Sequence, residues 1–262
     1  MWSSGTMYSL NGKIVLITGA SSGIGEACAR AFAAQEARLI LAARRVERLE
    51  KLRSELFMRY GALVHTLTLD VRDQAVVAAA IGGLPAEWGA IEVLVNNAGL
   101  SRGLDKLHEG SLADWEEMID TNLKGLLYVT RAVLPGMVQR RRGHVINIGS
   151  IAGHQAYPGG NVYCATKFAV NGLTQGLRID TLGTGVRVST VDPGMVETEF
   201  SVVRYHGDET RAGKTYTGVT PLTGADVAEA VIFCATRPAH VNINEVIIMP
   251  TDQATVTHVH RR

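Results

Sequence analysis

Short runs of aliphatic and β-branched residues alternate along the chain with longer segments in which apolar residues recur at the spacing of an α-helix. The short runs predict seven buried strands, at residues 13–18, 38–43, 63–70, 91–97, 144–150, 186–193 and 245–249. The periodic segments predict helices at residues 23–36, 45–60, 73–82, 111–140, 160–182 and 224–236. Because strands and helices alternate, we expect right-handed crossovers and a parallel sheet covered on both faces. We therefore predict a single doubly wound α/β domain over residues 1–262, with a seven-stranded parallel sheet.

Composition and charge narrow the class of protein. The formal net charge is +1, so the chain has no strong field for nucleic acid or an anionic membrane. The cysteines, Cys28, Cys164 and Cys234, lack metal-ligand spacing, and so sparse a set favours a reducing compartment over a disulfide framework. Neither a signal peptide nor a membrane-spanning stretch is recognisable in the sequence. We expect a cytoplasmic protein that contacts neither membranes nor nucleic acids.

A glycine-rich turn, TGASSGIG at residues 18–25, joins the first predicted strand to the first predicted helix. Gly19 permits a sharp turn, Gly23 lets the backbone approach a pyrophosphate, and Gly25 lets the helix pack closely on the sheet. The helix directs free N–H groups and the positive end of its dipole at the phosphates. This context is typical of a Rossmann fold. We expect a dinucleotide to contact Gly19, Ser21, Ser22, Gly23 and Ile24.

The end of the second predicted strand indicates which dinucleotide binds. An NAD enzyme usually carries an acidic residue there for the ribose hydroxyls. This chain instead has two alanines followed by Arg44 and Arg45, and an arginine fork suits the 2′-phosphate of NADP. We therefore predict NADP(H) as the cofactor. The alternative is that both arginines merely begin a solvated helix.

Candidate ligand contacts also follow the third and fourth predicted strands. Ligands of open α/β sheets bind at the carboxyl ends of the strands. Asp70 and Val71 are therefore candidate contacts of the adenine, and Asn97, Ala98 and Gly99 are candidate neighbours of the nicotinamide ribose. Taken alone, each of these short motifs is equally compatible with an ordinary turn.

The sequence YCATK places Tyr163 one helical turn before Lys167, so both side chains lie on the same face of a predicted helix. An isolated pair of this kind is more often a surface aromatic packed against a lysine stem. Beside a bound dinucleotide it acquires a chemical use. A free tyrosine titrates near pH ~10, and a nearby ammonium group favours the phenolate and lowers that pKa toward the working range of a base.

Together, these motifs resemble the short-chain dehydrogenases/reductases. The matching pieces are TGASSGIG at 18–25, NNAG at 96–99, Asn122 within TNLKG, Ser150, YCATK at 163–167 and Pro193-Gly194, and they span nearly the whole chain. The resemblance implies a catalytic set of Asn122, Ser150, Tyr163 and Lys167. It also implies cofactor contacts from Tyr163, Lys167, Pro193, Gly194, Val196 and Thr198.

The resemblance implies a role for each member of the catalytic set. Tyr163 would transfer the proton, Lys167 would hold the nicotinamide ribose, and Ser150 would hydrogen-bond the oxygen of the substrate. Asn122 would fix a water that links Lys167 to solvent. Read alone, Ser150 is an ordinary turn cap and Asn122 a helix-bending residue. One position departs from the pattern, because Gly149 stands where many relatives have a second serine.

Two segments fall outside the strand–helix alternation, residues 194–222 and 250–262. The stretches that overlap them, residues 192–217 and 237–253, look like those of one group within this family, the NADP-dependent 3-hydroxy acid dehydrogenases, also described as serine or L-allo-threonine dehydrogenases. That group oxidises small 3-hydroxy acids or reduces the matching semialdehydes, typically as homotetramers. We expect this activity and assembly. The alternatives are a broad carbonyl reductase, of the sulfoacetaldehyde or clavulanate-aldehyde type, and a non-catalytic nucleotide-binding scaffold.

The same two segments supply candidate substrate contacts. We expect residues 194–222 to form a lid over the substrate, which Ser150 and Tyr163 would also contact. An acidic substrate needs a cation, and Arg204 is the candidate, ahead of Arg211 and Lys214. Residues 250–262 form a polar tail that we expect to dock at a subunit interface or to be mobile. Its two histidines, His258 and His260, have no third ligand, so no metal site is expected.

Overall fold

A single parallel sheet forms the centre of the protein. The computed structural model describes residues 8–262; the N-terminal residues 1–7, part of the stretch in which no signal peptide is recognisable, lie outside the described residues. The strands are β1 (Ile14–Thr18), β2 (Arg38–Ala43), β3 (Val64–Thr68), β4 (Ile91–Asn96), β5 (Gly143–Ile148), β6 (Val186–Pro193) and β7 (Glu245–Ile248). They are ordered β3-β2-β1-β4-β5-β6-β7, and every neighbouring pair is parallel. The predicted fold class is confirmed.

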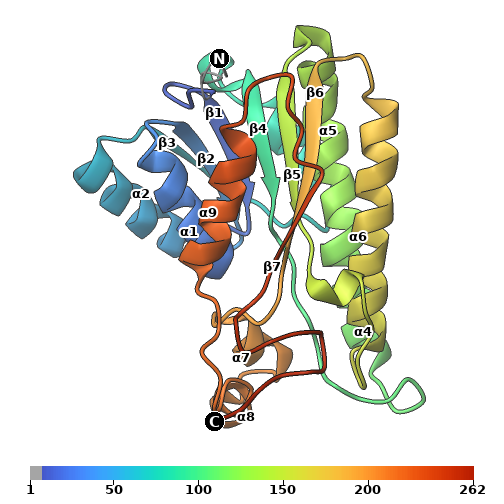
Figure 1. The fold of residues 1–262 in the computed structure, drawn as a ribbon. Coiled ribbons are helices and arrows are strands. Elements are labelled where there is room, and N and C mark those ends of the chain that lie inside the picture. Colours follow the sequence, from blue (N-terminus) through green and yellow to red (C-terminus); the bar gives the residue numbers. More distant parts are fainter. Residues whose placement is uncertain (1–7) are drawn as a thin grey trace, which may run out of the picture.

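Helices cover both faces of this sheet (Figure 1). One face packs against α1 (Gly23–Ala33), α2 (Val46–Tyr60) and α9 (Gly224–Ala235), and the other against α3 (Gln74–Gly82), α5 (Leu126–Arg140) and α6 (Asn161–Asp180). Strand β1 contributes to both cores because successive side chains point to opposite faces. Val15 and Ile17 pack toward α1, whereas Ile14 and Leu16 pack toward α3 and α5. Burial on both faces explains why the strands are continuous apolar runs.

The strand order reverses beside β1. The chain runs from β1 outward through β2 and β3, and then crosses back to β4 on the other side of β1. The loops that leave β1 and β4 therefore diverge at the carboxyl ends of these strands. In an open α/β sheet this divergence creates the crevice in which ligands bind.

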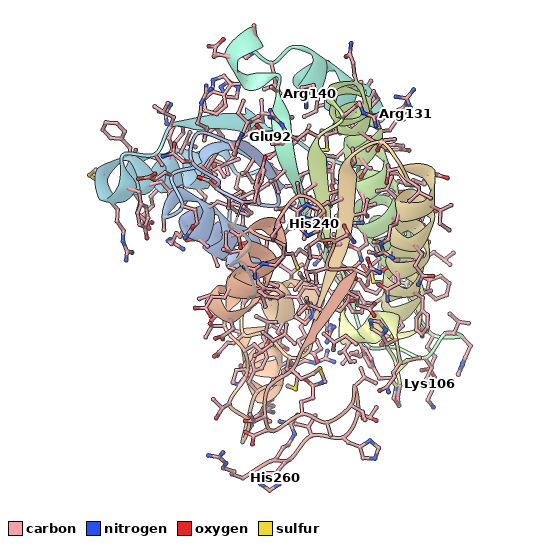
Figure 2. All side chains as sticks on the ribbon, turned by 45° about the horizontal axis from the view of Figure 1, so that its top comes forward. Glu92, Lys106, Arg131, Arg140, His240 and His260 are labelled. Carbon is pink, nitrogen blue, oxygen red and sulfur yellow. The ribbon has the colours of Figure 1, made fainter. Side chains whose placement is uncertain are left out.

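A buried ion cluster secures the opposite end of the sheet, where β4 begins. Figure 2 shows Glu92 and Arg140 close together there. Glu92 accepts a hydrogen bond of 2.6 Å from the Tyr8 hydroxyl and pairs with Lys13 at 3.3 Å and Arg142 at 3.1 Å. Arg140 donates to the first carbonyl oxygen of β4. These contacts join Tyr8 and the end of α5 to the start of β4.

The single helix expected over residues 111–140 contains a π-helical turn. Helix α4 (Leu112–Ile119) starts after the N-cap Ser111, which accepts a backbone N–H of the first turn, and it leads into the π turn at Asp120–Gly125 before α5 begins. A π turn winds an extra residue into the helix, and the spacing of apolar residues does not reveal it. Because of this turn, Asn122 points inward and is 2% exposed.

Residues 194–222 contain two short helices, α7 (Phe200–Arg204) and α8 (Glu209–Lys214). The C-terminal tail packs on this segment of its own chain, and Figure 1 shows the C-terminus beside α8. The Arg262 amide donates to the Gly218 carbonyl at 2.9 Å. The tail is therefore docked within the chain, because its backbone and the buried Gln253 find hydrogen-bond partners there.

Two further short helices complete the described elements, η1 (Ala86–Trp88) and η3 (Ile151–Gly153). The longest helix, α6, has 20 residues and carries charged side chains at Lys167, Arg178 and Asp180. Within residues 8–262, no helix combines the length and apolar character needed to cross a membrane.

Candidate active site

A groove with a volume of about 330 Å³ lies at the carboxyl ends of the strands. It is lined by the loops after β1 to β6, where the strand order reverses. The sequence-predicted residues that line it are Gly19, Ser21, Ser22, Gly23, Ile24, Arg44, Arg45, Asp70, Val71, Asn97, Ala98, Gly99, Ser150, Tyr163, Lys167, Pro193, Gly194, Val196 and Thr198. The structure thus brings together almost the whole predicted site. Asn122 and Arg204 lie just behind its wall.

The glycine-rich turn has the shape that a close backbone approach requires. Gly19 and Gly23 have φ angles of 65° and 57°, a region that favours glycine. A Cβ on Gly19 would lie 2.9 Å from the Cα of Ala98, and one on Gly25 would lie 2.5 Å from the carbonyl oxygen of Gly19. The Asn97 side chain locks the turn by donating to two of its carbonyl oxygens. The loop therefore forms an open cradle at the N-terminus of α1, which fits the pyrophosphate of a dinucleotide.

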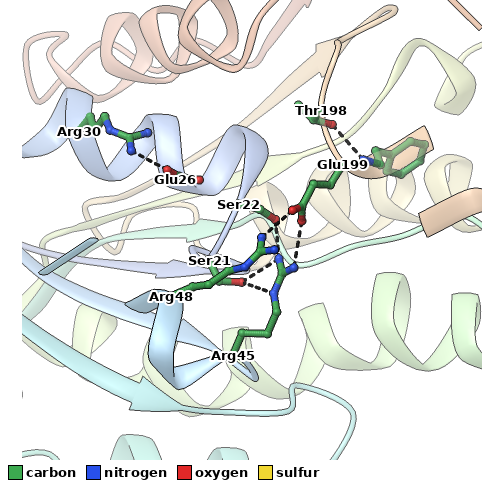
Figure 3. Close-up of polar contacts among 9 residues, drawn as sticks. Ser21, Ser22, Glu26, Arg30, Arg45, Arg48, Thr198 and Glu199 are labelled. Carbon is green, nitrogen blue, oxygen red and sulfur yellow. Dashed lines mark hydrogen bonds and ion pairs between the residues drawn. The ribbon is translucent and has the colours of Figure 1, made fainter. Parts of the chain in front are cut away.

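Beside this cradle, Arg45 bridges the glycine-rich turn and the segment after β6 (Figure 3). Its guanidinium donates to the hydroxyls of Ser21 at 3.2 Å and Ser22 at 2.8 Å. It also pairs with Glu199 at 2.9 Å, and Arg48 pairs with the other oxygen of that carboxylate. Two arginines that converge on a carboxylate, with two serine hydroxyls beside one of them, are a donor set that suits a phosphate dianion. The residues present therefore fit the 2′-phosphate of NADP.

Asp70, near the start of the loop after β3, is held by Arg72. Arg72 donates to both carboxylate oxygens, with distances of 3.0 and 2.6 Å. These hydrogen bonds hold the pKa of the Asp70 carboxyl below its usual value. The carboxylate therefore remains an acceptor at the rim of the groove, beside Val71.

The predicted catalytic side chains converge at the inner end of the groove. Tyr163, Lys167 and Ser150 are each 7 or 8% exposed. The ammonium group of Lys167 donates to the carbonyl oxygen of Ile148 at 2.9 Å and lies 5.9 Å from the centre of the Tyr163 ring. Burial lowers the pKa of Lys167 to about 8. Burial also raises the pKa of Tyr163, while the charge of Arg204 and a hydrogen bond from Ser150 oppose that rise.

Asn122 is held by three hydrogen bonds behind Lys167, the predicted catalytic lysine. Its amide donates to the Leu100 carbonyl at 2.8 Å and to the Thr166 hydroxyl at 3.1 Å, and its oxygen accepts the Leu100 N–H at 2.8 Å. A Cβ on Gly99 would lie 3.3 Å from the Asn122 oxygen and 3.8 Å from the Lys167 ammonium group. The two side chains thus flank the same glycine, and the π turn brings the asparagine to this position.

Arg204 lies against Tyr163, the predicted catalytic tyrosine. Its guanidinium carbon is 5.6 Å from the centre of the Tyr163 ring and 5.0 Å from that of Phe200, and it donates to the Tyr157 hydroxyl at 3.0 Å. The Arg204 Nε is buried and has no hydrogen-bond partner among the described residues. The weaker candidate Arg211 is exposed and stacks on Tyr205 instead. Lys214 is also exposed. Of the cations predicted to bind the acidic group of a substrate, Arg204 is therefore the one that lies beside Tyr163.

Sequence reasoning missed a second layer of charged residues around the site. Asp192 precedes the recognised Pro193-Gly194 motif and is fully buried, with His154 at 3.2 Å. The His154 nitrogen also lies 3.5 Å from Glu245 of β7. One ring nitrogen of His154 and one carboxylate oxygen each of Asp192 and Glu245 lie within 4.8 Å of one another. In the sequence, the unusual glycine at position 149 was the one hint of this cluster, and it did not indicate that Asp192, His154 and Glu245 meet there.

Comparison with known proteins agrees with this geometry. The short chain dehydrogenase family matches residues 13–208. NADP-dependent 3-hydroxy acid dehydrogenase YdfG of Salmonella typhi is 54% identical over 242 residues, 92% of this chain and 96% of that protein. Sulfoacetaldehyde reductase 2 of Chromohalobacter salexigens is 50% identical over 242 residues, 92% of this chain and 95% of that protein.

The fold is also similar to that of a solved structure. The closed form of a serine dehydrogenase complexed with NADP⁺ matches with a TM-score of 0.88 at 50% identity, covering 95% of this chain and 100% of that one. The family match extends over well over half of the sequence, and it includes the glycine-rich turn and the YCATK helix. The chain belongs to the short-chain dehydrogenases.

Proposed function

We propose that this protein is an NADP(H)-dependent oxidoreductase that oxidises the hydroxyl of small 3-hydroxy acids and reduces the matching semialdehydes. Serine, L-allo-threonine and 3-hydroxypropionate represent the substrate class. The observation that carries this proposal is the position of Arg204, whose guanidinium is held against the Tyr163 ring. Such a cation would pair with the carboxylate of a substrate whose hydroxyl lies at the tyrosine. The name of the relatives at 51 to 54% identity, NADP-dependent 3-hydroxy acid dehydrogenase, supports the same class.

The cradle and the arginine cluster would hold NADP(H) along the groove. Gly19, Ser22 and Gly23 would face the pyrophosphate, and Arg44 and Arg45 the 2′-phosphate. When bound, the cofactor supplies the nicotinamide ring that exchanges hydride with the substrate carbon. Thr198 lies beside the glycine-rich turn, because a Cβ on Gly23 would be 3.2 Å from it. This threonine would close the nicotinamide end of the site.

Tyr163 would move the proton that accompanies hydride transfer. In oxidation its Oη accepts the proton of the substrate hydroxyl, and in reduction it returns that proton to the carbonyl oxygen. Ser150 would orient the substrate oxygen toward Tyr163. The positive charges of Lys167 and Arg204 would favour the phenolate against the effect of burial. Lys167 would also hold the ribose, with Asn122 fixing the groups behind it.

A second candidate is a broad aldehyde reductase. The apolar side chains of Leu100, Phe200 and Val203 line the substrate end of the groove and favour neutral aldehydes. A sulfonate would use the same cation as a carboxylate, so sulfoacetaldehyde belongs to the acidic class of substrates. The two candidates therefore differ in whether an acidic group is required.

We also infer a cytoplasmic location and a homotetramer, both from the family resemblance. All three cysteines are free and buried, which accords with a reducing compartment. Light scattering coupled to size-exclusion chromatography would measure the mass of the assembly against the 28.1 kDa of one chain. A monomer in solution would contradict the tetramer.

The proposed function is tested by following NADP⁺ reduction at the nicotinamide absorbance. The substrates are L-serine, L-allo-threonine, 3-hydroxypropionate and a neutral alcohol of similar size. We expect turnover to be concentrated on the acids, because only they pair with Arg204. Turnover of the neutral alcohol alone would favour the aldehyde reductase. A protein that binds NADP⁺ and turns over none of them or their aldehydes would be a scaffold.

A further inference from the structure

The fully buried Asp192 contacts the backbone of the catalytic serine. It lies near the end of β6, and its Oδ1 accepts a hydrogen bond of 3.1 Å from the amide of Ser150. Its Oδ2 lies 3.2 Å from the Nε2 of His154. A buried carboxylate is destabilising unless it is paired. None of the roles proposed above uses this group, so its retention beside the active site requires an explanation.

The chain leaves a specific space for this carboxylate. A Cβ on Gly149 would lie 1.7 Å from the Asp192 Oδ1, a separation that no side chain could accept without displacing the carboxylate. The glycine that precedes the catalytic serine, where many relatives have serine, is therefore required by Asp192. Its backbone amide in turn donates to the Val191 carbonyl at 2.9 Å, which joins the two strand ends.

Several titratable or polar groups face Asp192 from the surrounding elements. His154 approaches from the end of η3, and Glu245 approaches His154 from β7. Asn171 of α6 lies 3.3 Å from the His154 nitrogen, and Thr190 of β6 hydrogen-bonds Asp192. Burial raises the pKa of Asp192 to about 6, His154 and Thr190 lower it, and Glu245 raises it. The charge of this carboxylate is thus set by a balance of neighbours.

The same carboxylate acts on the catalytic lysine. Lys167 is buried, and burial lowers its pKa to about 8, whereas the negative charge of Asp192 opposes that decrease. The lysine donates to Ile148, the last residue of β5, two positions before the serine that Asp192 holds. The two residues therefore act on one strand end from opposite sides.

We propose that Asp192 is a positioning residue with an electrostatic function. Its carboxylate holds the Ser150 amide in place and puts a buried negative charge beside the strand end to which Lys167 also donates. This inference rests on the roles proposed for Tyr163 and Lys167, and it extends the proposed catalytic set to a buried carboxylate whose partner His154 is 24% exposed.

The test compares Asp192→Asn with the wild type over pH 5 to 10, as kcat/KM for oxidation at saturating NADP⁺. Asparagine keeps an acceptor for the Ser150 amide and removes only the charge. Lys167 then loses its proton at a lower pH and no longer favours the Tyr163 phenolate. We expect the rising limb of the profile to move up by about one pH unit, so that kcat/KM falls about tenfold near neutral pH. KM should be almost unchanged, because Asp192 does not touch the substrate.

Two further variants test the direction in which the rising limb of the pH profile moves. His154→Gln removes the imidazole, which lowers the pKa of Asp192, so its limb should move in the same direction by a smaller amount. Glu245→Gln removes a charge that raises the pKa of Asp192, and because that carboxyl is already ionised above about pH 6, its limb should stay in place. These shifts can be measured even if Asp192→Asn does not fold. Shifts of equal sign in both variants would overturn the proposal.

Other outcomes are equally decisive. A uniform loss of kcat for Asp192→Asn, without movement of the limb, would mean a merely structural role. A wild-type profile that changes on removal of metal with EDTA would replace the Asp192–His154 contact with a bound divalent ion and overturn the proposal. Tyr163→Phe is measured alongside, with NADPH binding followed by fluorescence. If it binds NADPH and keeps full activity, the proton-transfer role proposed for Tyr163 fails, independently of Asp192; if the wild type binds NADPH but oxidises none of the acids, the proposed function itself fails.

Discussion

Arg45 and Glu199, 154 positions apart in the chain, form an ion pair of 2.9 Å across the groove. The pair joins the turn after β2 to the segment after β6, and Arg48 adds a second contact to the same carboxylate (Figure 3). Arg45 also uses its other nitrogens on the hydroxyls of Ser21 and Ser22. A 2′-phosphate must therefore displace the Glu199 carboxylate in order to reach Arg45.

Glu199→Gln is accordingly expected to tighten NADP⁺ binding about threefold to fivefold and to leave NAD⁺ binding unchanged. The magnitude is modest because both partners are about 40% exposed, and exposed ion pairs are worth less than about 1 kcal/mol. Calorimetric titration with both dinucleotides measures the difference, and Glu197→Gln serves as the matched control. Weaker NADP⁺ binding by Glu199→Gln would instead mean that the Arg45–Glu199 ion pair persists in the complex and stabilises the bound cofactor.

The cofactor preference should depend on the two arginines after β2. Arg44→Asp combined with Arg45→Ala removes the fork and restores an acidic partner for ribose hydroxyls, so kcat/KM with NADP⁺ should fall about 100-fold relative to NAD⁺. Arg53→Ala, on the following helix α2 and outside the groove, should leave the ratio unchanged. The assignment of the fork is refuted by a double variant that still prefers NADP⁺.

Arg204→Ala should raise KM for a 3-hydroxy acid by about tenfold or more, because a charge-assisted hydrogen bond is worth roughly 1.5–3 kcal/mol. KM for a neutral aldehyde should change little. A loss of kcat common to both substrates is also expected, since Arg204 lowers the pKa of Tyr163. Steady-state kinetics on both substrate classes, with Arg211→Ala as the control, separate the effects. Equal changes in KM would sink the role of Arg204 as an anchor.

Asp192 should also affect the stability of the fold. Its pKa is about 6 in the folded chain and about 3.9 in an unfolded one, so the folded state holds a proton between these values that the unfolded state has lost. The contribution of this group to stability therefore decreases as pH rises from about 4 to 6. Asp192→Asn should gain up to about 3 kcal/mol at pH 7.5 relative to wild type and almost nothing at pH 4.

Scanning calorimetry at both pH values checks this sign. A melting temperature that rises by several degrees at pH 7.5 in Asp192→Asn, together with a loss of activity, would be a trade of stability for function. Destabilisation at pH 7.5 would instead mean that the hydrogen bonds of Asp192 to His154 and the Ser150 amide more than offset the effect of burial.

The sequence predicts those parts of the site that depend on local spacing. Tyr163 and Lys167 share a face because one helical turn separates them, and the glycine-rich turn follows β1 directly. The parallel sheet with helices on both faces follows from the alternation of strands and helices, whereas the strand order comes from the structure. Residues at the carboxyl ends of different strands could therefore be assigned to one groove before their contacts were known.

Other features could not be predicted from a single sequence. The π turn that brings Asn122 inward adds one residue to a helix whose apolar pattern is otherwise regular. The contacts of Glu199 and of Asp192 join residues tens of positions apart, and they depend on how loops and sheet register meet. The tail gave no periodicity, so its docking on residues 194–222 was not foreseen.

The space that Gly149 leaves for Asp192 also restricts how this active site evolves. A serine at position 149 would overlap the carboxylate 43 positions further along the chain, so that substitution is closed while Asp192 remains. If Asp192 is first replaced by a residue with a smaller side chain, the carboxylate no longer occupies the space beside Gly149. Position 149, before the predicted catalytic Ser150, can then accept a side chain. The two sites therefore form an epistatic pair with a preferred historical order, and a lineage that has retained both residues inherits the buried charge as a constraint on its descendants.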